Sequence, residues 1–152
     1  YSVANPLKPE YMSSVTHAFG CDPVVVDNDL AYVTIRSGTT CGQEANDLII
    51  IDVKDVKAPK KLVSFGMTSP RGLGIDAGKL FLCDDGLKIF NITDNPLALA
   101  TNIIKHEKGM VGFDLIPYNN TLMMIAEDGL YQYDYTDTNN IRLLSKLAFT
   151  KE

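Results

Sequence analysis

The sequence contains few of the residues that build metal and redox sites. Its 152 residues include only three cysteines (Cys21, Cys41 and Cys83) and two histidines (His17 and His106). No two cysteines have the CxxC spacing, so a zinc site has little support, and we assign no metal ligand and no cofactor. The odd number of cysteines permits one disulfide and one free thiol, which leaves the redox compartment undetermined.

Long apolar runs and basic patches are missing as well. No run approaches the ~20 apolar residues that a membrane helix needs, so we expect no transmembrane segment. The net charge is −5 and the basic residues are scattered, which argues against nucleic-acid binding. The chain has no signal peptide and begins at Tyr1, so we expect it to be processed, trimmed or incompletely covered. The composition, 45% hydrophobic and 22% charged, predicts one globular domain.

What the sequence does contain is a repeat. Residues 48–55 read LIIIDVKD, residues 87–94 read LKIFNITD and residues 130–137 read LYQYDYTD, so that the three copies begin 39 and 43 residues apart. A partial fourth copy, SVAN at residues 2–5, is followed by a proline at the same offset as in the first complete copy. A period of about 40–50 residues is typical of four-stranded propeller blades.

The segments around each copy obey the same period. Two apolar runs precede each copy, and one further strand-like segment follows each copy. Turn residues separate these segments. We therefore predict an all-β fold with three four-stranded antiparallel blades at about residues 22–67, 71–106 and 112–149. Residues 10–17 are expected to form the outer strand of a preceding blade. A β-sandwich would instead require clean alternation and no such period, and helical periodicity is absent.

The uninterrupted aliphatic run of the first copy has a physical explanation. A strand in the middle of a blade is covered on both faces by neighbouring blades, so it has no polar face. At the end of this strand in each copy, Asp55, Asp94 and Asp137 are expected to bond the backbone two residues further on and so form a turn.

The repeat core LIIID resembles the motif that names the LVIVD-repeat β-propellers, with LKIFN and LYQYD as degenerate copies. The wider stretches DPVVVDNDLAYVTIRSGTTCG and PRGLGIDAGKLFLCDDGLKIFNITD resemble that family too, and the resemblance covers nearly the whole chain. It implies a bacterial cell-envelope protein, often a lipoprotein or exported domain, without an established enzymatic activity. Three blades cannot close a ring, because propellers have about four to eight. We therefore expect an arc whose exposed faces contact the remaining blades or a protein partner.

One face of such an arc collects the candidate binding residues. In a four-stranded meander, the connections between blades share a rim with the loops between the second and third strands. The longest of these loops spans residues 36–46. The candidate ligand-binding residues on this face are Asp22, Arg36, Arg71, Asp84, Asp85, Glu127 and Asp128, and Cys41 and Glu44 fall there too.

Most of these residues have a structural as well as a functional interpretation. The acidic pairs before Gly86 and Gly129 could bind a cation or carry acid–base chemistry, but Asp-Gly also favours a type I′ hairpin turn, and we prefer the turn. Arg36 and Arg71 could bind an anionic ligand, or pair with the plentiful carboxylates nearby, which we prefer.

Two further groups have the same ambiguity. Cys21 and Cys41 fall on one face and are our candidate disulfide, which would pin the long loop, whereas Cys83 is expected to be an inert core thiol. The alternating Tyr131, Tyr133 and Tyr135 point to one face, as a carbohydrate platform or, more commonly, as core between blades. The two histidines are expected to be solvated or hydrogen-bonded.

The sequence is compatible with three functions. The first is a non-catalytic binding or assembly module that uses the loop face, with a protein partner or a small anionic or carbohydrate ligand. The second is a propeller hydrolase or lyase that uses the acidic residues with Arg36 and Arg71. The third is a subunit of an outer-membrane complex. An enzyme requires acid and base groups that converge on one pocket with at least one strongly shifted pKa, and no catalytic residue is assigned.

Overall fold

The computed structural model describes residues 1–15, 23–38 and 45–150. These residues form three four-stranded antiparallel sheets, each built from strands consecutive in the chain. The first sheet contains β1 (Val24–Asp27), β2 (Leu30–Ile35), β3 (Asp47–Asp52) and β4 (Lys60–Gly66). The second contains β5 (Leu73–Asp76), β6 (Lys79–Cys83), β7 (Leu87–Asn91) and β8 (Ile103–Glu107), and the third β9 (Gly112–Tyr118), β10 (Thr121–Ala126), β11 (Gly129–Asp134) and β12 (Arg142–Ala148). The all-β prediction with three such sheets is confirmed.

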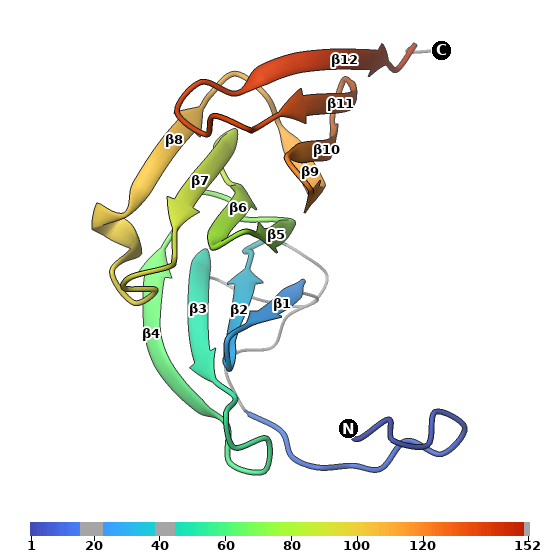
Figure 1. Cartoon of the computed structure of the whole chain (residues 1–152), viewed down its shortest axis with the longest axis vertical. Helices are drawn as coiled ribbons and strands as arrows, with labels where there is room; N and C mark the ends of the chain where they lie inside the picture. The colour runs from blue at the N-terminus through green and yellow to red at the C-terminus, as the bar shows by residue number, and fades with distance from the viewer. Residues whose placement is uncertain (16–22, 39–44, 151–152) are drawn as a thin grey trace.

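The three sheets follow one another in chain order (Figure 1). The first strand of each sheet lies on the inner side, and β5 contacts β1 before it and β9 after it. The last strands, β4, β8 and β12, lie on the outer side of the molecule. Neighbouring sheets therefore meet through their faces rather than through their edges.

The repeat extends to the hydrogen bonds of the turns. The turn between the first two strands of each sheet has two consecutive residues with positive φ: Asn28–Asp29, Ala77–Gly78 and Asn119–Asn120. Such pairs define the type I′ turn that suits two-residue hairpins. The acidic or amide residue that ends each LIIID-like core also makes the same hydrogen bond in all three sheets. The Oδ1 atoms of Asp52, Asn91 and Asp134 each accept the N–H two residues on at 2.9 Å.

The expected turn after the third strand forms in each sheet, with one change. Asp55 and Asp137 each accept the N–H two residues on at 3.0 Å, as predicted. In the second sheet the acceptor is Asn95 rather than Asp94, because that copy carries one more residue before its turn. Asn5, in the partial copy, accepts the N–H of Leu7 at 3.1 Å in the same way.

Each outer strand carries a β-bulge at the same level. Where β3 pairs with β4, the register skips Leu62, and the equivalent skipped residues in β8 and β12 are Ile104 and Leu144. A bulge leaves one residue out of the ladder and sharpens the local twist. The repeat pattern does not indicate this bulge, since the skipped residues are ordinary aliphatics.

The burial of β3 explains its uninterrupted aliphatic sequence. Leu48 and Ile50 pack in the cluster between the first and second sheets, whereas Ile49 and Ile51 pack on the opposite face. All four side chains are at most 3% exposed. In contrast, β11 alternates between buried and half-buried residues, because only one of its faces is covered. The prediction that the first copy is buried on both faces is confirmed.

Two predicted strands are wrong in part. Residues 11–15 form no strand, and Glu10 makes only an isolated bridge with Ser2. An outer strand must pair with the third strand of a sheet. In all three described sheets the third strand is already paired with its own fourth strand, so residues 10–15 have no strand to pair with. In the second sheet, residues 99–101 form a short 3-10 helix, so β8 begins later than expected, at Ile103.

Candidate functional site

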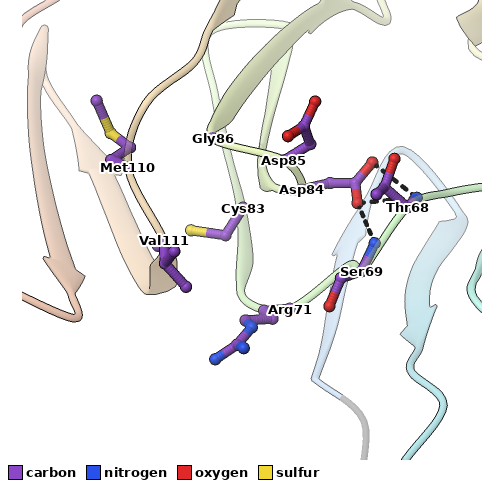
Figure 2. A pocket seen from close by; sticks show the side chains of 10 residues that line it. Thr68, Ser69, Arg71, Cys83, Asp84, Asp85, Gly86, Met110 and Val111 are labelled. Carbon is purple, nitrogen blue, oxygen red and sulfur yellow. Dashed lines mark hydrogen bonds between the residues drawn. The ribbon is translucent and has the colours of Figure 1, made fainter.

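Loops of the second sheet and the segment that enters the third sheet meet in a pocket (Figure 2). A cavity of about 180 Å³ lies between the segment that enters β5, the turn between β6 and β7, and the segment that enters β9. Its lining residues include Thr68, Ser69, Arg71, Cys83, Asp84, Asp85, Met110 and Val111. The connections between sheets and the turns between second and third strands therefore do share one face, and three of the candidate residues line one cavity.

Asp84 is held inside this face by its own chain. Its side chain is fully buried, and Oδ1 accepts the backbone N–H groups of Thr68 at 3.0 Å and Ser69 at 2.6 Å. Its Oδ2 lies 2.6 Å from Nζ of Lys88, whose side chain is only 15% exposed. Every strong acceptor position of this carboxylate is occupied, so Asp84 orders the loop that enters β5.

Asp85 lies on the outside of the same turn. Asp85 and Gly86 both have positive φ, which agrees with the turn interpretation of this acidic pair. The carboxylate forms an ion pair with Lys108 at 3.1 Å, and this hydrogen bond holds the pKa of Asp85 below its ordinary value. The Nε2 atom of His106 lies 2.8 Å from the Asp85 carbonyl oxygen, so that histidine is hydrogen-bonded as expected.

The turn between β10 and β11 is built differently from the prediction. Neither Glu127 nor Asp128 has a positive φ, and Gly129 already belongs to β11, so the turn is not of type I′. Glycine is required there by close approach, because a Cβ on Gly129 would lie 2.5 Å from the carbonyl oxygen of Leu147. The N–H of Glu127 donates to the carbonyl of Val111 at 2.9 Å.

The carboxylate of Asp128 is also engaged within the chain. Lys146 Nζ lies 2.6 Å from Oδ2, and the hydroxyl of Tyr131 donates to Oδ1 at 2.8 Å. The hydrogen bond from Lys146 lowers the pKa of Asp128 most, and the hydrogen bond from Tyr131 lowers it further. Asp84, Asp85 and Asp128 thus each have a lysine partner, which the motif-based analysis did not identify.

Arg71, unlike the three aspartates, forms no ion pair among the described residues. The backbone of Arg71 is fixed by its N–H, which donates to Cys83 at 2.9 Å, and by its carbonyl, which accepts the Thr34 hydroxyl at 2.7 Å. Its guanidinium lies 4.7 Å from the centre of the Phe113 ring, a cation–π distance. Burial and, second, the nearby charge of Arg36 lower the pKa of Arg71.

Among the residues that the structure describes, Arg36 and Arg71 form no ion pair with a carboxylate. The expected pairing stays a prediction, because Asp22 and Glu44 of the same face lie outside the described residues. Lysines, rather than these arginines, neutralise the acidic turns, because Lys88 and Lys146 lie on strands adjacent to Asp84 and Asp128.

Cys83 is a core thiol, as predicted. It is 1% exposed and free, and burial raises its pKa to about 12, so it is protonated and unreactive at neutral pH. Asp22, Cys21 and Cys41 lie outside the described residues, as do His17 and Glu44. The disulfide between Cys21 and Cys41 stays a prediction.

The alternating tyrosines belong to the core. Tyr131, Tyr133 and Tyr135 are at most 8% exposed and pack between the second and third sheets. The rings of Tyr131 and Tyr133 are stacked with centroids 5.9 Å apart, and Tyr135 packs on Phe81 at 4.8 Å. Rings buried between sheets cannot form a platform for carbohydrate, so the core interpretation is confirmed.

Comparison with known proteins gives no match, either to a protein-family model or to a curated protein. The resemblance to LVIVD-repeat propellers therefore stays a prediction from the quoted residues. Among the described residues there is no helix of sufficient length and hydrophobicity to span a bilayer. The same residues contain no group of three or more side chains suited to hold a metal ion.

Proposed function

We propose that the chain is an arc of a β-propeller that acts as a non-catalytic binding module. Its ligand would be a small anion, bound at the inner rim by Arg36 and Arg71. The protein would belong to the bacterial cell envelope, which is what its resemblance to LVIVD-repeat proteins implies.

The propeller arrangement is supported by the equivalence of the three sheets. All three have a type I′ first turn, the same bulge in the outer strand and the same bonds after the third strand. Successive sheets meet face to face through their inner strands, as blades do.

The observation that carries the anion proposal is the contrast between the acids and the arginines. On one loop face, Asp84, Asp85 and Asp128 are each neutralised by a lysine. On the same face Arg71 contacts the Phe113 ring and forms no ion pair among the described residues, and the charges of Arg36 and Glu127 shift its pKa in opposite directions. Two like charges held close together repel each other, and an anion between them would relieve that repulsion. Planar guanidinium groups suit the bidentate binding of carboxylate or phosphate.

The hydrolase or lyase alternative has less support. The buried carboxylate in the pocket lining, Asp84, already accepts from the N–H groups of Thr68 and Ser69 and from Lys88. The nucleophile candidate beside it, Cys83, has its pKa raised to about 12 by burial. Proton transfer requires a group whose pKa lies near the working pH, and the buried thiol of Cys83 does not provide one.

Calorimetric titration with inorganic phosphate and with succinate tests the proposal. We expect saturable binding that weakens about tenfold or more in Arg71→Gln and in Arg36→Gln, since a charge-assisted hydrogen bond contributes about 1.5–3 kcal/mol. The matched control is Arg142→Gln, because Arg142 is exposed and already paired with Asp134 at 3.1 Å. Absence of binding by the unchanged protein, or an equal loss in the control, overturns the proposal.

The envelope location has its own test. Antibody detection in the membrane and periplasmic fractions of the source cells should find the protein there, and detection only in the cytosolic fraction would contradict the location. Intact-mass measurement without reductant would show the bond between Cys21 and Cys41 as a deficit of about two daltons, the mass of the two hydrogens lost.

A further inference from the structure

One position of the repeat changes its chemical character in the second sheet. In the three cores LIIID, LKIFN and LYQYD, the second residue is Ile49, Lys88 and Tyr131. The side chain of Lys88 is only 15% exposed, and it lies on the same face of β7 as the buried Phe90. Lysine is almost never buried unless it is paired, and the other two sheets build the equivalent strand without one. The repeat therefore does not need this charge in order to fold.

The connection between the third and fourth strands also differs in the second sheet. It spans residues 53–59 in the first sheet and 135–141 in the third. In the second sheet it spans residues 92–102 and includes the 3-10 helix Leu99–Thr101. The side chain of Leu99 is 1% exposed and packs in the cluster between the first and second sheets. The longer connection therefore covers part of the boundary between these two sheets, beside the end of β4 (Figure 1).

Both of these features line one cavity of about 360 Å³ between the first and second sheets. The end of β4 and the residue after it contribute Phe65 and Met67. Strand β7 contributes Lys88 and Phe90, and the connection contributes Leu99. Small-molecule sites have volumes of about 300–1,000 Å³ and an apolar, often aromatic lining with a few polar groups. The cavity therefore has the size and the composition of a small-molecule site.

The ammonium group of Lys88 is the one charged group among the described residues that line this cavity. Its Nζ atom lies 2.6 Å from Oδ2 of Asp84, which is its only hydrogen-bond acceptor in the described chain. A lysine ammonium has three N–H donors, so further donors remain for an acceptor atom in the cavity. Because Asp84 already neutralises Lys88, and because a second carboxylate beside Asp84 would be repelled, an uncharged acceptor suits this position best.

We infer that this cavity binds an uncharged aromatic molecule whose carbonyl oxygen accepts a hydrogen bond from Lys88. The rings of Phe65 and Phe90 and the thioether of Met67 suit contacts with an aromatic ring. A charge and a helix that the other repeats omit meet at this cavity, which assigns both to ligand binding rather than to the fold. The inference does not rest on the anion site, because the two cavities have no lining residue in common.

Fluorescence titration with three naphthalene derivatives tests the class of ligand. We expect saturable binding of 2-acetylnaphthalene, about tenfold or more tighter than that of 2-ethylnaphthalene, which has the same shape but no oxygen to accept from the ammonium. The charged 2-naphthoate should compete weakly. No binding of 2-acetylnaphthalene, equal affinity for the acetyl and ethyl compounds, or stronger competition by 2-naphthoate overturns the inference.

Two sets of variants test the position of the site. The double variant Asp84→Asn with Lys88→Met removes both charges together, so no unpaired charge stays buried, and it should bind the acetyl and ethyl compounds equally. Ala100→Trp places a ring at the mouth of the cavity, since Ala100 is exposed and belongs to the lining, and should weaken binding of both compounds about tenfold.

Ala58→Trp is the matched control, because Ala58 is exposed in the corresponding connection of the first sheet, and its affinities should equal those of the unchanged protein. An equal loss in Ala58→Trp and Ala100→Trp, or a preference for the acetyl compound that persists in the double variant, overturns the inference. If the double variant does not fold, the comparison of Ala100→Trp with Ala58→Trp decides alone. Phosphate titration of Ala100→Trp tests the anion site separately.

Discussion

The hydroxyl of Tyr135 donates a hydrogen bond to Oδ2 of Asp76 at 2.5 Å, and this bond joins two sheets. Tyr135 follows the last residue of β11, and Asp76 is the last residue of β5. The ring of Tyr135 packs on Phe81 of the second sheet at the same time. One residue of the third repeat therefore fixes the third sheet against the second by both an apolar and a polar contact.

Replacement of Tyr135 by phenylalanine should destabilise the fold by about 1–2 kcal/mol, because a hydrogen bond to a charged acceptor is lost while the ring contact is kept. The urea midpoint of unfolding measures this change. Tyr118→Phe is the matched control, since Tyr118 is 76% exposed. An equal shift in both variants would show that the bond to Asp76 contributes nothing specific.

Asp84→Ala should be far more harmful than Asp85→Ala, although the two residues are adjacent. The first substitution leaves the Lys88 ammonium and the N–H groups of Thr68 and Ser69 without their acceptor in a buried site. Loss of one partner from a buried pair costs about 3–5 kcal/mol. Thermal unfolding of both variants is the measurement. A similar decrease in melting temperature for the two would refute the structural role of Asp84.

Gly72→Ala should separate the second and third sheets. A Cβ at this position would lie 2.5 Å from Cα of Asp114 on β9, and the N–H of Gly72 donates to the carbonyl of Phe113 at 3.0 Å. Overpacking of this kind costs about 1–3 kcal/mol. Gly66→Ala is the control, because nothing lies within 4 Å of the Cβ it would add. If Gly72→Ala unfolds at the same urea concentration as Gly66→Ala, the close approach of the two sheets is not a constraint.

Stability should decrease as the pH rises above about 9. Burial raises the pKa of Cys83, Tyr32 and Tyr133 to about 12 each, and burial together with the bond to Asp76 raises that of Tyr135. In the unfolded chain the thiol and the phenols lose their protons at about pH 8.5 and pH 10, while the folded chain still holds them. The unfolded state is then favoured progressively as pH increases.

Urea midpoints at pH 7, 9, 10 and 11 measure this dependence. Cys83→Ala provides the comparison: whatever its absolute stability, the decrease should begin nearer pH 10 than pH 9, because the thiol, which in the unfolded chain loses its proton at the lowest pH, is then absent. Midpoints that stay constant up to pH 11 would contradict the assignment of buried, protonated groups.

The strands and the turns after them could be predicted, because both depend on residues that are close together in the sequence of each repeat. The four aliphatic residues at 48–51 indicate a strand covered on both faces, and the alternation in LYQYD indicates one covered face. The acids that end these strands satisfy the N–H groups of the next turn, which is chemistry within two residues. Local hydrogen bonds of this kind are visible in a sequence.

The parts that failed depend on residues distant in the chain. The expected strand at residues 10–17 is local in sequence but needs a partner strand that no described sheet provides. The lysine partners of the acidic turns were not predicted either, because Lys146 is 18 residues from Asp128 in the sequence. Lys88 did offer a signal, because it stands within the otherwise apolar core of its repeat, where a buried charge needs a buried partner.

The bulge shared by β4, β8 and β12 has a consequence for how this molecule can meet its neighbours. A flat, regular edge invites sideways addition of foreign strands and growth into fibrils, and kinks and basic side chains along an edge suppress it. Each outermost strand here is kinked at the same level, and all three strands carry lysine or arginine near the kink. The outer edges of the three sheets are thus guarded against lateral polymerisation.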